Sequence, residues 1–211
     1  KPQQNSAAVA IQDFSSSSSA PVQNVNITNS AFTNNDNRGV DARGYVNVTV
    51  TESTFTDNGA DAFGSGGNNG FTFIAQSGGK LIVDQNDITH PASSTSSVTA
   101  LRAGNAPTNT NAPANSILAS GNSIIMNGNS DGFGTSTSNG NIDATCNWWG
   151  TEDSNTIDGL VDSSATFSPF LTKDSIGNSY PWDTNNSYIC GNVNLKIQGD
   201  FASTSGTEVY L

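Results

Sequence analysis

Four aspartates of this chain could act together, because the repeats would bring their carboxylates near one another. Asp41 and Asp61 occupy similar positions in neighbouring repeats, and Asp57 and Asp84 lie close to them in sequence. Carboxylate oxygens are ligands that Ca²⁺ prefers, so a row containing Asp41, Asp57 and Asp61 could bind calcium. The alternative is that these are ordinary solvated side chains of an acidic protein. No cofactor other than calcium is suggested.

The basic side chains belong to no catalytic motif. Arg38, Arg43, Lys80 and Arg102 are the candidates in the first half of the chain. His90 is the single histidine and precedes a proline, where it could act as a general base or have a structural role only.

The two cysteines, Cys146 and Cys190, are compatible with one disulfide in an oxidising compartment. Such a bond would link the last repeat to the C-terminal tail. The alternative is two separate thiols, with Cys146 buried as a small apolar residue.

A repeated pattern describes the scaffold that must position these side chains. An apolar residue is followed by another two positions later, by Ser or Asn at plus five, and by a large apolar residue at plus seven. The five copies start 23, 33, 36 and 25 residues apart, at Val25, Val48, Leu81, Ile117 and Ile142. Repeats of this length without a helical period are typical of solenoids.

Each repeat predicts strands joined by polar turns. Alternating apolar and polar residues indicate a strand, and Ser or Asn at plus five suits a turn. Stacked repeats would form a ladder of Asn and Ser side chains. The plus-seven residues would form an internal apolar column: Phe32, Phe55, Ile88, Ile124 and Trp149. This plan is an all-β parallel β-helix, and no amphipathic helix is visible.

Two insertions account for the longer spacings. They include 65–70 and 103–115, which are rich in Gly, Pro, Asn and Thr and predict surface loops. If the chain binds a ligand, these loops are the predicted contact surface; otherwise they are spacers. The candidate ligand-binding residues are Ser65, Asn68, Asn69, Asn109 and Asn111.

The domain prediction divides the chain at residue 172. Residues 1–172 form the parallel β-helix with a terminal coil, and the apolar residues of 151–172 form a C-terminal cap. Residues 173–211 form a β-rich tail that packs on the cap or leads to a further domain.

The charge of the chain restricts its partners. The net charge of −11 disfavours nucleic acid and anionic membranes. No apolar stretch approaches about 18 residues, so no membrane insertion is predicted.

The last repeat carries the most specific sequence motif. Asn147, Trp148, Trp149 and Gly150 are followed by a Ser-Pro-aromatic-Leu segment at 168–171. This resembles the terminal coil of right-handed parallel β-helix proteins of the pectate-lyase-like superfamily, in particular secreted or surface-attached bacterial proteins of the Bacteroidetes type. The resemblance covers 24–172 and implies the fold more than the activity, because this superfamily includes lyases, hydrolases, epimerases and adhesins.

Three functions remain open from the sequence. The leading hypothesis is a non-catalytic structural or adhesive module, extracellular or on the cell surface, that belongs to a larger protein and contacts a polysaccharide or surface glycan. The second is a polysaccharide lyase or glycoside hydrolase, an activity found in the resembled superfamily, for which Asp61, Asp84 and Arg102 are the catalytic candidates to test first. The third is a subunit that self-associates into an extracellular filament.

Overall fold

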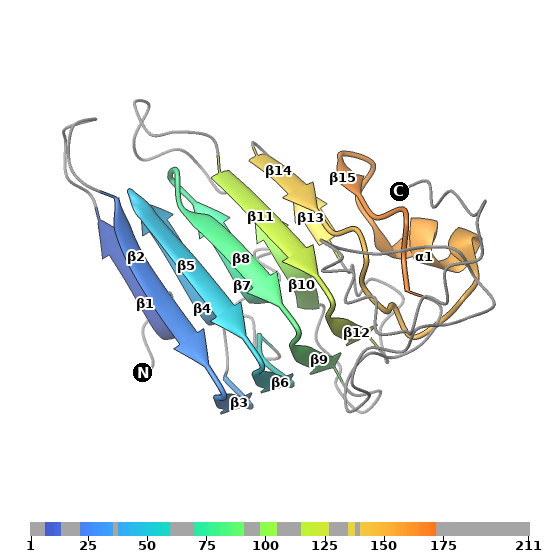
Figure 1. Ribbon diagram of the computed structural model, residues 1–211, viewed down its shortest axis with the longest axis horizontal. Helices are drawn as coiled ribbons and strands as arrows, with labels where there is room; N and C mark the ends of the chain where they lie inside the picture. Colours follow the sequence, from blue (N-terminus) through green and yellow to red (C-terminus); the bar gives the residue numbers. More distant parts are fainter. Residues whose placement is uncertain are drawn as a thin grey trace, which may run out of the picture.

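Three parallel β-sheets make up most of the described chain. The computed structural model describes residues 7–13, 22–35, 38–59, 70–90, 98–104, 115–126, 135–137 and 140–171. Within these ranges the chain forms strands and one short helix, α1 (Ser154–Leu160). Figure 1 shows the repeats following one another along the long axis, from β1, β2 and β3 at one end to α1 at the other.

The strands divide regularly among the sheets. Sheet A contains β1 (Ala7–Asp13), β4 (Arg38–Gly44), β7 (Gly70–Gln76), β10 (Val98–Ala103) and β13 (Thr135–Thr137). Sheet B contains β2 (Gln23–Thr28), β5 (Val46–Thr51), β8 (Lys80–Asp84), β11 (Asn115–Ser120), β14 (Gly140–Asp143) and β15 (Ala165–Thr166). Sheet C contains β3 (Ala31–Thr33), β6 (Thr54–Thr56), β9 (Asp87–His90) and β12 (Ser123–Met126).

Each of the first four repeats adds one strand to sheet B, then to sheet C, then to sheet A, whereas β14 and β15 of the last repeat both belong to sheet B. Neighbours within a sheet are therefore three strands apart in sequence, from β1 to β13 in sheet A and from β3 to β12 in sheet C. All of these pairings are parallel. The all-β class is confirmed, and the parallel arrangement is compatible with the predicted β-helix.

One hydrophobic cluster draws side chains from all three sheets. In sheet B the first residues of successive repeats lie in register, from Val25 through Val48 and Leu81 to Ile117 and Ile142. In sheet C the plus-seven residues pair in the predicted order: Phe32, Phe55, Ile88 and Ile124. The Phe32 and Phe55 rings stack at 4.7 Å. Each large side chain that is fully buried contributes about 2 kcal/mol to folding.

The predicted ladder of polar side chains is present at the corner between sheets B and C. Its members are Ser30, Ser53, Asn86, Asn122 and Asn147. Each side-chain oxygen from Ser53 onward accepts a hydrogen bond from the backbone N–H of the preceding member, at 2.9 to 3.1 Å. From Ser53 onward the members are buried, so the backbone groups at this corner are satisfied without water.

The side-chain amide of Asn122 forms hydrogen bonds with backbone groups of two repeats. Its Nδ2 donates to the carbonyl oxygen of Val83 at 2.8 Å and to that of Ser120 at 3.0 Å. Its Oδ1 accepts from the backbone N–H of Asn86 at 2.9 Å, while its own backbone N–H donates to Asn147 Oδ1 at 3.0 Å. Through its side chain and its backbone N–H together, Asn122 therefore connects three consecutive repeats.

The residue before each ladder member has a left-handed backbone conformation. In all five repeats φ lies between 49° and 65°, at Asn29, Glu52, Gln85, Gly121 and Cys146. Residues other than glycine rarely adopt positive φ, and the surrounding structure imposes it here. This sharp turn directs the chain from sheet B into sheet C.

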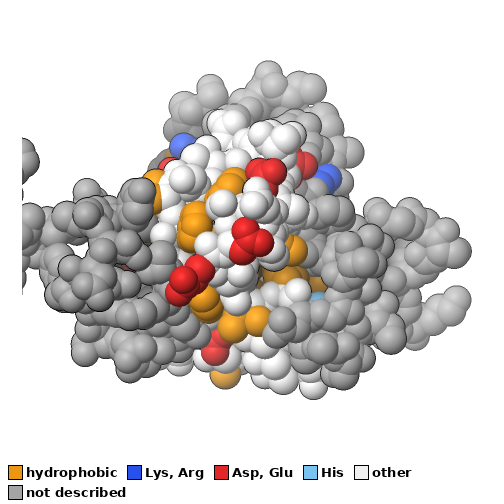
Figure 2. All heavy atoms as spheres, turned by 90° about the vertical axis from the view of Figure 1, so that its right-hand side faces the viewer, with side chains coloured by type: hydrophobic (Ala, Val, Ile, Leu, Met, Phe, Trp, Pro, Cys, Tyr) orange, Lys and Arg blue, Asp and Glu red, His pale blue; other side chains and the backbone are white. Residues whose placement is uncertain are grey.

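The C-terminal end of the described chain contains the helix that the sequence did not predict. Asp153 caps α1 by accepting from the backbone N–H of Asn155 at 3.1 Å, and Ile157 is buried in the core cluster. The expectation that the chain contains no helix was wrong. The helix was missed because seven residues are too few to display a helical period. Figure 2 shows this end, where acidic and hydrophobic side chains alternate.

Replacing Asn122 with Ala tests the ladder. We expect Asn122→Ala to lower the free energy of unfolding by about 3 kcal/mol, because each buried group left without a partner costs about 1–3 kcal/mol. The measurement is urea unfolding. Asn122→Leu restores the volume but not the amide, and we expect a similar loss. The control is Asn141→Ala on an exposed strand position, with a change within about 0.5 kcal/mol. Full stability of the Leu variant would contradict the hydrogen-bonding explanation.

Candidate functional site

A buried polar cluster in sheet A is the most concentrated charged arrangement in the described chain. We call Arg38, Asp41, Arg43 and Gln76 the Asp41 cluster. Asp41 and Arg43 are two residues apart on β4 and therefore point to the same face of the strand. Gln76 lies on β7 in register with Arg43, and Arg38 is the first residue of β4.

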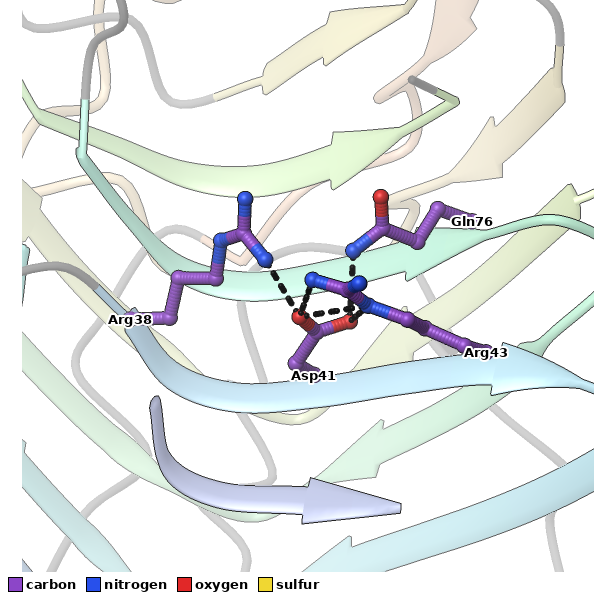
Figure 3. A network of polar contacts seen from close by, with 4 residues as sticks. All are labelled: Arg38, Asp41, Arg43 and Gln76. Carbon is purple, nitrogen blue, oxygen red and sulfur yellow. Dashed lines mark hydrogen bonds and ion pairs between the residues drawn. The ribbon is translucent and has the colours of Figure 1, made fainter. Parts of the chain in front are cut away.

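Both oxygens of Asp41 accept hydrogen bonds. Oδ2 lies 2.5 Å from Nη1 of Arg38 and 2.6 Å from Nη2 of Arg43. Oδ1 lies 2.7 Å from Nε2 of Gln76 and 3.0 Å from Nε of Arg43. In Figure 3 the two guanidinium groups approach the carboxylate from opposite sides. Asp41 is fully buried and Arg38 nearly so, while the Arg43 side chain is 20% exposed.

Among the described residues, the Asp41 cluster holds more positive than negative side chains. Two guanidinium groups, those of Arg38 and Arg43, face the single carboxylate of Asp41. The Nε of Arg38 is also buried without a hydrogen-bond partner in the described part of the chain. Burying a charge or a donor without a partner is costly.

Arg102 adds a third positive charge to the same sheet. Asp41 pairs with Ile74, and Ile74 pairs with Arg102 on β10, so Arg102 is two strands from Asp41, about 10 Å. Its guanidinium carbon lies 5.7 Å from the centre of the Phe71 ring. Burial lowers the pKa of Arg102, and the carboxylate of Asp162 acts in the opposite direction.

Asp84 and Arg102, both catalytic candidates from the sequence, belong to different sheets. Asp84 ends β8 in sheet B, whereas Arg102 belongs to sheet A. The Ser120 hydroxyl donates to Asp84 Oδ1 at 3.1 Å. Partial burial raises the pKa of Asp84, and this hydrogen bond lowers it to a smaller extent.

Asp57 and His90 form a separate pair near the end of sheet C. Nδ1 of His90 lies 3.0 Å from Oδ1 of Asp57, although their orientation does not meet the geometry of a hydrogen bond. His90 is buried, with 3% of its side chain exposed. The calcium candidates Asp41 and Asp57 thus have protein partners, and no group of three metal-ligating side chains gathers in the described ranges.

Several predicted residues lie outside the described ranges. They include the tail (173–211), most of the two insertions (65–69 and 105–114) and these candidates: Asp61, Ser65, Asn68, Asn69, Asn109, Asn111 and Cys190. The ends of the predicted insertions are strand residues instead of loop, because Gly70 begins β7, Ala103 ends β10 and Asn115 begins β11. Cys146 is buried and has no disulfide partner within the described ranges, and its bond to Cys190 stays a prediction.

The grouping of Arg38, Arg43 and Gln76 around Asp41 was missed from the sequence. A usable signal existed, because Arg43 and Gln76 are 33 residues apart, the same separation as the starts of the second and third repeats. Side chains at that spacing become neighbours on adjacent strands.

Comparison of the chain with protein-family models, with curated proteins and with solved structures found no match. No helix in the described ranges is long and apolar enough to span a membrane. Functional inference therefore rests on the residues and their geometry.

Replacing Asp84 with Asn tests the electrostatic cost at the end of β8. Because the pKa of Asp84 is raised in the folded state, folding favours the protonated form, and stability falls as pH rises through the folded pKa. We expect Asp84→Asn to raise Tm modestly at pH 7, with the difference from the unmodified chain vanishing below the ordinary aspartate pKa of about 3.9.

The control is Glu52→Gln. Glu52 is exposed and takes the corner position that Gln85 occupies in the next repeat, so Tm should hardly change. Thermal unfolding from pH 3 to pH 8 gives both comparisons. A lower Tm for Asp84→Asn at pH 7 would show that the charge stabilises this corner.

Proposed function

We propose that the three sheets are the walls of a right-handed parallel β-helix, and that this chain is a non-catalytic module that contacts glycans outside the cell. The β-helix is supported by the regular succession of sheets B, C and A and by the shared core. Right-handedness follows from the strong preference of parallel crossover connections for that hand. The module would belong to a larger secreted or surface protein.

The Asp41 cluster is the observation that carries the non-catalytic assignment. General acid–base catalysis needs a carboxyl group within reach of a substrate proton. Both oxygens of Asp41 instead accept from Arg38, Arg43 and Gln76, and Asp41 is fully buried. With both oxygens engaged inside the protein, Asp41 is not positioned to exchange a proton with a substrate.

Polar strand faces support glycans as the ligand class. On sheet B the side chains of Asn24 and Asn47 are neighbours, with Nδ2 of Asn47 donating to Oδ1 of Asn24 at 3.1 Å. Amides and hydroxyls can both donate and accept hydrogen bonds, which suits the hydroxyl groups of sugars. A sheet of stacked repeats offers such groups along a linear polymer.

A glycan array followed by product analysis tests this function. We expect the intact chain to bind a subset of immobilised glycans and to leave them unchanged after prolonged incubation, as judged by mass spectrometry. The matched control is Asn122→Ala unfolded in urea, which should bind none. Shortened or unsaturated products would assign the chain to the hydrolases or lyases. Failure to bind any glycan would remove the ligand part of the proposal.

A further inference from the structure

We propose that the outermost strands β1, β2 and β3, which we call the N-terminal edge, are a self-association surface for a second copy of this chain. The two copies are related by a twofold axis, and β2 of one protomer pairs antiparallel with β2 of its partner. A twofold contact uses the same surface on both copies, so it closes at two chains. This interface goes beyond the proposed contact with glycans and does not depend on it.

The N-terminal edge is where all three sheets end. β1, β2 and β3 pair on one side with β4, β5 and β6, and no other described strand pairs with them. In Figure 1 they lie together at the end of the molecule opposite α1. An outermost strand carries a row of backbone N–H and C=O groups that another strand can pair with. An occupant that satisfies these groups must therefore supply a strand of its own.

Hydrogen bonds identify which backbone groups of β2 face outward. The N–H groups of Gln23 and Asn29 donate to carbonyl oxygens at the two ends of β5. Alternate residues of a strand direct their backbone groups to opposite sides. The N–H and C=O groups of the even-numbered residues therefore point away from β5, at Asn24, Asn26 and Thr28. Two antiparallel copies of β2 would present these donors to each other's acceptors.

The apolar core is also less covered at this end. Its columns begin with Ile11 in sheet A, Ile27 in sheet B and Phe32 in sheet C, and all three are partly exposed. The residues that follow them in the columns are buried: Ala42, Val50 and Phe55. At the other end Ile157 of α1 is fully buried in the core cluster. Within the described ranges, the N-terminal edge lacks the cover that α1 provides there.

The strands of the N-terminal edge lack the features that usually prevent strand addition. Natural edge strands are protected by charged side chains, proline or bulges. β1, β2 and β3 together contain one charged residue, Asp13 at the end of β1, and no proline. Each residue of β2 pairs with one residue of β5, so β2 has no bulge. These outermost strands therefore resemble the interior strands of a sheet.

The distribution of charge favours a second copy in this twofold arrangement. The chain has a net charge of −11, so two copies repel each other unless they meet where charge is sparse. Residues 7–35 contain a single charged side chain, that of Asp13. The α1 end exposes Glu152, Asp153 and Asp158, and Figure 2 shows its acidic surface. A twofold contact keeps the two acidic ends apart, whereas head-to-tail stacking would bury their carboxylates at a cost.

Sedimentation equilibrium and hydrogen exchange of the intact chain test the interface together. We expect a reversible equilibrium between one and two chains that tightens with added salt, because salt screens the repulsion between acidic molecules. The backbone amides of Asn24, Asn26 and Thr28 should exchange more slowly at concentrations where two chains associate. The reference is Thr49, the partner of Asn26 on the interior strand β5, whose amide should be equally protected at every concentration.

A matched pair of variants at Asn26 tests the strand pairing. Asn26→Pro removes an outward N–H and leaves the bonds to β5 in place, because proline is tolerated on the open side of an edge strand. We expect the Kd for self-association to rise at least about tenfold, since a twofold contact loses the donor on both copies. The control Asn26→Thr keeps the N–H and should leave this Kd within about twofold. Backbone spectra of each variant establish that it is folded.

Several outcomes would overturn the interface. The mass of a single chain at every concentration up to the solubility limit would show that no second copy binds. Masses that continue to grow beyond two chains would replace the twofold contact with a filament. Dissociation by added salt, or an unchanged Kd for Asn26→Pro, would place the contact away from the uncharged edge. None of these results depends on whether the chain binds a glycan.

Discussion

The ladder at the corner between sheets B and C is the interaction on which the rest of the structure depends. Every repeat turns from sheet B toward sheet C there, and a turn inside a stacked structure leaves backbone N–H and C=O groups without strand partners. Asn86, Asn122 and Asn147 satisfy these groups from within the protein. Because each amide bonds to adjacent repeats, it also fixes their relative position. A register shift of one residue would move every apolar side chain out of the core.

The register set by the ladder also creates the Asp41 cluster. Arg43 and Gln76 belong to different repeats and meet because β4 and β7 align with a constant offset. The same alignment places Ile74 between Asp41 and Arg102. An insertion between two strands does not disturb the alignment of β4, β7 and β10 as long as each repeat retains its corner and its ladder residue. Long insertions can therefore vary without moving the charged residues of sheet A.

The repeat was sufficient to predict the strands, the apolar columns and the ladder, because each depends on residue type at a fixed offset. The left-handed corner was not predictable in this way. The corner residues are of five different types: Asn29, Glu52, Gln85, Gly121 and Cys146. Residue type therefore does not mark this position, because the stacking of the repeats imposes the backbone conformation. Helix α1 was missed because its single buried residue, Ile157, gives no period.

The candidate site was only partly accessible from the sequence. Arg38, Arg43 and Asp41 were recognised as candidates, but they were assigned separately, to basic chemistry and to calcium. Charge pairing across strands depends on register, which composition and spacing alone do not fix. The sequence also did not show that Asp84 and Arg102 lie on different sheets, because the assignment of each strand to a sheet depends on how the repeats stack.

Hydrogen exchange of the side-chain amides of Asn86 and Asn122 tests the central role of the ladder most directly. Both amide groups are buried and hydrogen-bonded to neighbouring repeats, so they should exchange only when the whole structure opens, as slowly as the most protected backbone amides. The exposed amide of Asn141 should exchange within the first spectrum. Exchange of the Asn86 and Asn122 amides as rapid as that of Asn141 would contradict the claim that the ladder holds the sheets in register.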